Sequence, residues 1–349
     1  DVVYKLLGGL RGGLASATII ASTILAAMVG VIGAAEVTMG ILALPAMLKR
    51  GYDPKLACGS ILAGGTLGIL IPPSTGFIIY ALLTEESIGQ LFLAGVLPGI
   101  LLTALFMLTI YILTRFNPSI GPAGPRLSWR ERIASVWRAT NLIGIVIVVL
   151  GGIYIGVFTP VEAAAIGAFL TFLLMLARRK VTFQTMQFCV LETIKTFAMV
   201  YLIVIGAFIF NPFLAVTQLP ADLATFVASL NLSPTGVLIL IIFGYIVLGT
   251  FLEGFAIMVL TIPIVFPMIV GMGYDPIWFG VLLVVVLEMS LISPPLGLNV
   301  FVVKGIAPDV PMSEIFKGVL PFWGAMLVCT AILIIFPEIA LLLPKTMLR

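Results

Sequence analysis

Long apolar runs without a charged residue constrain this chain more than any other feature of its sequence. One such run fills residues 142–157, and similar runs recur along the whole length. Of the 349 residues, 61% are hydrophobic and 9% are charged, which is too little polar material to cover a water-soluble protein. A bilayer core forces backbone polar groups to pair within the chain, so spans are helices or closed barrels. Because the runs lack the alternation of barrel strands, we expect an all-α polytopic membrane protein.

The apolar segments are of two kinds. Regions 12–48 and 235–270 each consist of two apolar arms with small residues between them. The arms 36–48 and 235–248 are shorter than the roughly 20 residues that a helix needs to cross a bilayer. We therefore predict two re-entrant hairpins, each of which enters and leaves on one side. The predicted full crossings are residues 56–83, 91–114, 140–157, 160–177, 196–215, 277–303 and 319–344.

The distribution of basic residues supports this topology. With both hairpins re-entrant, sixteen of the eighteen Lys and Arg residues fall on one side, including those of the loop 115–139. That side is cytoplasmic by the positive-inside rule. The loops 84–90, 216–234 and 271–276 carry no Lys or Arg and fall on the other side. If either hairpin were a full crossing, the bias would be lost. The topology places the C-terminus in the periplasm.

The sequence also contains an internal repeat. The tetrapeptide Gly-Tyr-Asp-Pro occurs at 51–54 and at 273–276, and the same offset of 222 relates Pro72-Pro73 to Pro294-Pro295. An odd number of predicted crossings separates the hairpins, so the repeats are inverted. Inverted repeats with broken helices are typical of secondary transporters, whose binding site lies near the membrane midplane. The predicted organisation is a first repeat in 1–114 (hairpin 12–48, broken helix 56–83), a cytoplasmic basic loop in 115–139, and a second repeat region in 140–345 (hairpin 235–270, broken helix 277–303).

The two Pro-Pro breaks suggest cation sites. Consecutive prolines prevent a continuous helix and leave carbonyl oxygens without their usual donors. Sodium is a hard cation, for which carbonyl and hydroxyl oxygens are suitable ligands. The alternative is a proline kink whose carbonyls are satisfied by neighbouring helices and Ser/Thr side chains. The residues predicted to hold sodium are Gly65, Thr66, Gly68, Pro72, Thr250, Ser290, Ser293, Pro295 and Gly297.

The hairpin tips and helix ends suggest an anion site. Half-helix N-termini carry partial positive charge and free N–H groups, which attract an anionic substrate; the alternative role of the glycines is tight helix packing. The predicted substrate-binding residues are Gly30, Gly33, Ser74, Gly249, Gly254 and Asn299. Acids at membrane depth are expensive and indicate function. Glu36, Glu253 and Glu288 are therefore expected to contact a cation, pair with Lys304 or cap a helix.

Other residues are expected to have structural roles. Thr159 and Glu162 have the spacing of a capping box, and the segments 182–195 and 217–231 are expected to lie along the membrane interface. The chain has no His, which removes the usual zinc and haem ligands. It also has no paired catalytic carboxylates, so we expect no enzyme activity. We expect three buried structural thiols, Cys58, Cys189 and Cys329.

The segments 44–53, 64–74, 158–163 and 293–299 resemble the large membrane subunit of the tripartite ATP-independent periplasmic (TRAP) transporters. The resemblance covers essentially the whole chain and implies that the family's first spans precede residue 1. It implies an elevator-type carrier in the bacterial inner membrane that imports organic acids, such as C4-dicarboxylates, with sodium as the coupling ion. The implied partners are a small four-helix membrane subunit and a periplasmic substrate-binding protein, with no nucleic acid. Many relatives have a serine-rich first tip, whereas residues 29–33 of this chain have no hydroxyl.

Two further interpretations are compatible with the sequence. A stand-alone ion-coupled carrier of the same broad fold, for citrate, sulfate or arsenite, would have the same repeats. A channel is the other, although occlusion between two hairpins is unsuited to a continuous pore.

Overall fold

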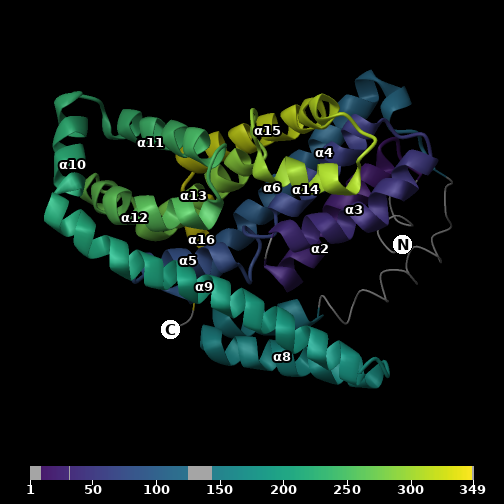
Figure 1. The fold of residues 1–349 in the computed structure, drawn as a ribbon, viewed down its shortest axis with the longest axis horizontal. Coiled ribbons are helices and arrows are strands. Elements are labelled where there is room, and N and C mark those ends of the chain that lie inside the picture. The colour runs from purple at the N-terminus through teal and green to yellow at the C-terminus, as the bar shows by residue number, and fades with distance from the viewer. Residues whose placement is uncertain (1–8, 31, 125–143, 348–349) are drawn as a thin grey trace.

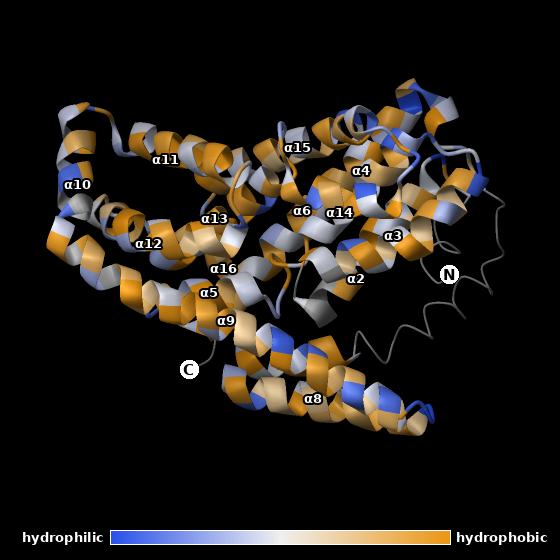
Figure 2. Ribbon diagram, viewed as in Figure 1, coloured by the Kyte–Doolittle hydropathy of each residue, from blue (hydrophilic) through white to orange (hydrophobic). Residues whose placement is uncertain are grey.

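The computed structural model describes residues 9–30, 32–124 and 144–347, and the regular structure in these ranges is all helical (Figure 1). Apolar residues predominate along most of the helices (Figure 2). Among the described residues, five helices are long and apolar enough to cross a membrane. These are α6 (Ile88–Phe116), α8 (Pro160–Ala177), α9 (Phe183–Thr217, counted to Leu214), α12 (Gly254–Gly271) and α15 (Met312–Ile335). The prediction of an all-helical membrane protein is confirmed.

The two predicted hairpins are pairs of packed helices, and both predicted breaks are present. In the first half, α2 (Gly13–Val29) and α3 (Ile32–Lys49) are followed by α4 (Pro54–Thr66), a break, and α5 (Thr75–Thr84). In the second half, α11 (Pro234–Gly249) and α12 are followed by α13 (Pro276–Leu291), a break, and α14 (Leu298–Ile306). Shifting α3 by 222 residues gives the bounds of α12. Both Pro-Pro peptide bonds are cis.

The same local sequence starts α4 in the first half and α13 in the second. The carboxylates of Asp53 and Asp275 accept hydrogen bonds from the first amides of α4 and α13, and a proline follows each of them at the first helical position. Gly51 and Gly273, which end the preceding hairpins, have φ of 75° and 85°. Glycine adopts this left-handed conformation without the cost that a side chain brings. The repeated tetrapeptide is therefore a turn followed by a helix cap.

The halves interlock through their second elements. Helix α3 of the first hairpin packs against α14, and α12 of the second hairpin packs against α5. Helices α4 and α13 both pack against α15 and α6. Each hairpin therefore contacts the broken helix of the other half as well as its own, which brings both tips and both breaks to the middle of the molecule (Figure 1).

Residues that the predicted topology places near the same side contact one another. The amide of Gly12 donates to the carbonyl of Gly121 (2.8 Å), and Lys55 Nζ lies 2.9 Å from Glu314 Oε2. The amide of Leu14 donates to the hydroxyl of Tyr52 (3.0 Å), so the start of α2 lies beside the end of α3. Near the other predicted side, the Tyr80 hydroxyl donates to the Pro276 carbonyl (2.7 Å).

One predicted segment boundary is wrong, and one predicted segment continues into a longer helix. Helix α9 is continuous over 35 residues from Phe183, so residues 183–195 form its first part. That this part lies along the membrane interface stays a prediction. The early polar residues of α9 do not interrupt a helix, because only proline and glycine break helices strongly. The predicted crossing 319–344 is two helices, α15 and α16 (Glu338–Thr346). Pro337 ends the first, since it disfavours helical geometry at Phe336, where φ is −124°.

The segment between the halves has few contacts with the rest of the chain. A short helix, Gly144–Tyr154, precedes α8, and α9 leads to α10 (Leu219–Ser229), within the predicted interfacial segment 217–231. The predicted crossing 140–157 begins outside the described residues. Thr159 and Glu162 form the predicted capping box of α8, whose one buried residue is Ala163. Cys58 and Cys329 are buried as predicted, but Cys189 on α9 is exposed because α9 packs against little else.

Candidate functional site

A cavity of about 120 Å³ lies where the hairpin tips meet the breaks. The first residues of three helices line it: Ile32 and Gly33 of α3, Gly254 and Phe255 of α12, and Leu298 and Asn299 of α14. Helix N-termini present free amides and partial positive charge. Three of the predicted substrate-binding residues, Gly33, Gly254 and Asn299, thus meet at one cavity. Its remaining lining residues are Ile69, Glu253, Met258, Leu287 and Leu291.

The helix ends at this cavity are not equivalent. Helix α14 begins at Gly297, which has φ 53° and makes no side-chain cap, and Asn299 Nδ2 is buried without a partner among the described residues. At α12, by contrast, Glu253 Oε2 accepts hydrogen bonds from the amides of Phe255 (2.8 Å) and Ala256 (3.1 Å). Glu253 is therefore a helix cap and occupies the anion position at its own helix. Of these two helix starts, that of α14 is the one open to an anion.

The hydroxyls predicted as sodium ligands donate to carbonyls of their own helices. Thr66 donates to Ala63 (2.8 Å), Ser290 to Leu287 (2.7 Å) and Thr250 to Val247 (2.7 Å). In each case the hydrogen is used, and the oxygen lone pairs remain able to contact a cation. Of the other predicted ligands, Gly65 lies in the last turn of α4, and the breaks contain Gly68, Pro72, Pro295 and Gly297.

Ser293 has a partner that the sequence did not reveal. Its hydroxyl donates to the Met289 carbonyl (2.8 Å) and accepts from Trp323 Nε1 (2.6 Å). Trp323 lies on α15, 30 residues further along the chain, within an apolar run. No spacing or motif relates the two residues, so this contact could not be predicted from the sequence.

The first hairpin tip is attached to the first break. The carbonyl of Gly30 accepts hydrogen bonds from the amide (3.3 Å) and the hydroxyl (2.8 Å) of Thr75. Gly30 has φ 66°, and a Cβ there would lie 2.7 Å from the carbonyl oxygen of Pro73. Ser74 caps α5 and donates its hydroxyl hydrogen to Ile69. Gly30 thus joins the tip to the break, Ser74 bonds within the break, and neither residue lines the cavity.

The tip of the second hairpin, between Gly249 and Gly254, also packs closely against its own broken helix. Gly249, the last residue of α11, lies so close to the Ser290 hydroxyl that a Cβ at Gly249 would overlap it. Gly249 is therefore needed for packing and lies outside the cavity lining, which is the alternative role considered for the glycines.

Two of the three predicted acids are wholly buried. Glu36 on α3 packs against Gly65 of α4, and the Glu288 carboxyl on α13 lies near the backbone amides of Ile69 and Leu70 without a well-aligned hydrogen bond. The predicted pairing of an acid with Lys304 is wrong. The Lys304 ammonium donates to the carbonyls of Pro308 (2.7 Å) and Val310 (2.8 Å), which follow the end of its helix.

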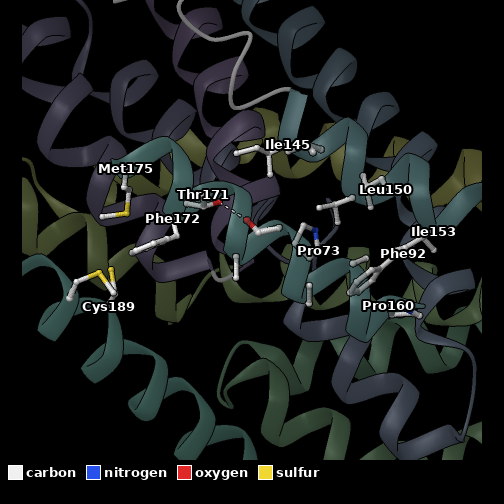
Figure 3. A pocket seen from close by; sticks show the side chains of 17 residues that line it. Pro73, Phe92, Ile145, Leu150, Ile153, Pro160, Thr171, Phe172, Met175 and Cys189 are labelled. Carbon is white, nitrogen blue, oxygen red and sulfur yellow. Dashed lines mark hydrogen bonds between the residues drawn. The ribbon is translucent and has the colours of Figure 1, made fainter. Parts of the chain in front are cut away.

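A larger cavity of about 530 Å³ lies between α8, the start of α9 and the first break, and it is lined almost entirely by apolar side chains. Figure 3 shows Pro73 and Phe92 on one side of it, and Phe172, Met175 and Cys189 on another. Helix α8, which begins at the edge of this larger cavity, is capped by Thr159 and Glu162, whereas α14 begins at the smaller cavity without a side-chain cap, so the smaller cavity is the better candidate.

Comparison with known proteins identifies the family. The family model described as "Tripartite ATP-independent periplasmic transporter, DctM component" matches residues 1–339. The chain belongs to this family. The match confirms the resemblance, and it favours a TRAP large permease over a stand-alone carrier.

Several curated relatives are similar over nearly the whole chain. The C4-dicarboxylate TRAP transporter large permease protein DctM of Pseudomonas aeruginosa is 37% identical over 346 residues, 99% of this chain and 80% of the relative. The sialic acid TRAP large permease of Vibrio cholerae is 33% identical, and the ectoine TRAP large permease of Halomonas elongata is 32% identical. The alignments cover 99% and 98% of this chain, and 80% of each relative. The protein is therefore an integral membrane permease subunit of the TRAP type, a transporter family. The relatives' names include different solutes.

Proposed function

We propose that this DctM-family permease imports an organic acid with sodium as the coupling ion. The observation that supports the anion is the convergence of three helix N-termini on the 120 Å³ cavity, one of which, α14, has no side-chain cap. The acid group of the substrate accepts hydrogen bonds there and from Asn299. The cavity has room for about four water volumes, which suits a small carboxylate or the acid group of a larger solute.

Sodium complements this charge. An anion in an apolar interior is costly unless a positive charge accompanies it. In the proposal the carbonyls at both breaks and the hydroxyls of Thr66, Thr250, Ser290 and Ser293 hold sodium within the same central region. Each ion then favours binding of the anion, and the anion favours binding of the ion by the same factor.

The re-entrant topology completes the proposal. The two halves are inverted, the first hairpin opens to the cytoplasm, and the second hairpin and the C-terminus face the periplasm of a bacterial inner membrane. The interlocked group of hairpins and broken helices moves as one body, in an elevator motion, against the rest of the permease. A small four-helix subunit and a periplasmic binding protein complete the transporter.

Reconstitution tests this function. The permease is placed in proteoliposomes with its small subunit, and the binding protein is supplied with the labelled form of whichever ligand co-purifies with it. An inward sodium gradient is expected to drive accumulation, which omission of the binding protein abolishes. Accumulation that is equal with choline in place of sodium contradicts the proposed coupling.

A further inference from the structure

Two buried polar side chains of the first hairpin have no role in the proposed sites. Glu36 on α3 and Ser22 on α2 are both 0% exposed. Neither carboxyl oxygen of Glu36, nor the Ser22 hydroxyl, has a hydrogen-bond partner in the part of the chain that the structure describes. No ion pair found there includes Glu36. Buried charges are normally paired or bind a metal ion, so this carboxylate lacks its counter-charge.

Both side chains approach the same short stretch of α4. A Cβ on Gly64 would lie 2.5 Å from Ser22 Oγ, and a Cβ on Gly65 would lie 3.1 Å from Glu36 Oε1. The two glycines are consecutive, so their missing side chains leave room on adjoining faces of one helical turn. Oxygen atoms from two different helices are thereby brought against a third helix, next to the first break.

The hydroxyl of Ser22 differs from those of its neighbours. Thr18 and Thr23, on the same helix, donate to the carbonyls of Leu14 and Ile19, each over 2.9 Å. Such bonding to the carbonyl four residues earlier satisfies a hydroxyl within a helix. Ser22 makes no such bond and lies against Gly64 instead, so its oxygen is free to contact a ligand.

We propose that Glu36 and Ser22 bind one monovalent cation against the Gly64–Gly65 face of α4. The oxygen donors suit a hard cation, for which carboxylate and hydroxyl groups are ordinary ligands. One carboxylate neutralises a single positive charge, whereas a divalent ion would leave excess charge in an apolar region. Water supplies the remaining contacts. The cation is sodium, and its carboxylate ligand distinguishes this site from the neutral oxygen sets proposed at the breaks, of which the first adjoins it at Gly65.

This inference rests on the proposed sodium coupling and adds to it. Glu36 lies one helical turn from Ile32 and Gly33, which line the anion cavity, so these residues share one face of α3. A cation at Glu36 adds positive charge beside that cavity and links both arms of the first hairpin to α4. Occupancy of the site therefore favours a bound anion.

Sodium binding by the purified permease tests the site without requiring transport. Labelled sodium (²²Na⁺) and the rise of the melting temperature in sodium over choline are measured for wild type, E36Q and S22A. E36Q is expected to bind one sodium ion fewer. S22A is expected to require about tenfold more sodium, since it removes one contact to a charged ligand. The matched controls are E192Q, at an exposed acid, and S60A, at a buried serine that bonds to Ala57.

The outcomes distinguish failure of this inference from failure of the proposed function. Unchanged sodium binding in both E36Q and S22A overturns the inference. It would mean that Glu36 carries a proton and binds no metal ion, a state that E36Q imitates. If E36Q does not fold, unchanged affinity in S22A relative to S60A overturns the inference. If E36Q binds sodium normally and a sodium gradient still drives its uptake, this inference fails and the proposed function stands. Sodium-independent uptake by wild type contradicts the proposed function even if E36Q loses a bound ion.

Discussion

The indole of Trp323 donates a hydrogen bond of 2.6 Å to the hydroxyl of Ser293, at the second break. The hydroxyl in turn donates to Met289, so its lone pairs have a fixed direction. W323F removes the donor and leaves the serine free to rotate. We expect the half-saturating sodium concentration for uptake to rise about fivefold, equivalent to about 1 kcal/mol.

The chain offers a matched control for this substitution. Trp278 is also buried and donates its indole hydrogen to a backbone carbonyl, that of Leu333 (2.8 Å), away from the breaks. W278F is expected to lower the free energy of unfolding by about 1–3 kcal/mol, because the carbonyl loses its partner, while its sodium dependence stays that of wild type. Equal shifts of sodium dependence in the two variants would show that the Ser293 contact has no special role.

The packing of Gly249 against Ser290 leads to a second prediction. G249A places a methyl group where the Ser290 hydroxyl lies, so the tip of the second hairpin must move away from α13. Overpacking of this kind costs about 1–3 kcal/mol, and we expect uptake to be nearly lost. G244A, on the same helix with nothing within 4 Å of the new Cβ, is the control and should keep its activity. Normal uptake by G249A contradicts the close contact.

The breaks and hairpins follow from local sequence, which is why they could be predicted. Paired prolines end helices wherever they occur, and Gly-Tyr-Asp-Pro supplies its own turn and cap, so α4 and α13 begin where the sequence indicated. Pro337 was an equally local signal, but the prediction of a single crossing over 319–344 ignored it.

The tertiary contacts of the site could not be predicted in the same way. Trp323 meets Ser293, and Glu36 meets Gly65, only because helices from distant parts of the chain pack together. For Glu253 the sequence left cation binding, pairing with Lys304 and helix capping open, and the choice of capping depends on where α12 begins. A periodic pattern indicates that a helix exists, but it does not specify which helix lies against it.

Glu86, in the turn between α5 and α6, gives a prediction about pH. Burial, and to a smaller extent the Asp275 carboxylate, raises the pKa of Glu86 above its ordinary value. The folded protein therefore holds this proton more tightly than the unfolded chain, and its ionisation opposes folding. The loss of stability that comes from ionising Glu86 is absent below the ordinary pKa of a glutamate and complete above the raised pKa of Glu86.

The E86Q variant tests this assignment through the melting temperature. At pH 7, E86Q should have a slightly higher melting temperature than wild type, which corresponds to a gain of no more than about 0.5 kcal/mol in the free energy of unfolding. This difference should vanish as the pH falls below about 4. The adjacent E85Q makes the same change of net charge and is the control. A difference between E86Q and wild type that grows on acidification contradicts a raised pKa at Glu86.

The opposite orientation of the two halves is tested most directly by labelling equivalent positions. Arg50 and Met272 are related by the offset of 222 and stand at the closing ends of the two hairpins. After replacement of Cys58, Cys189 and Cys329, R50C and M272C are exposed to a membrane-impermeant maleimide in right-side-out and inside-out vesicles. M272C should be labelled from the periplasmic side and R50C from the cytoplasmic side. Labelling of both from the same side would contradict the inverted arrangement.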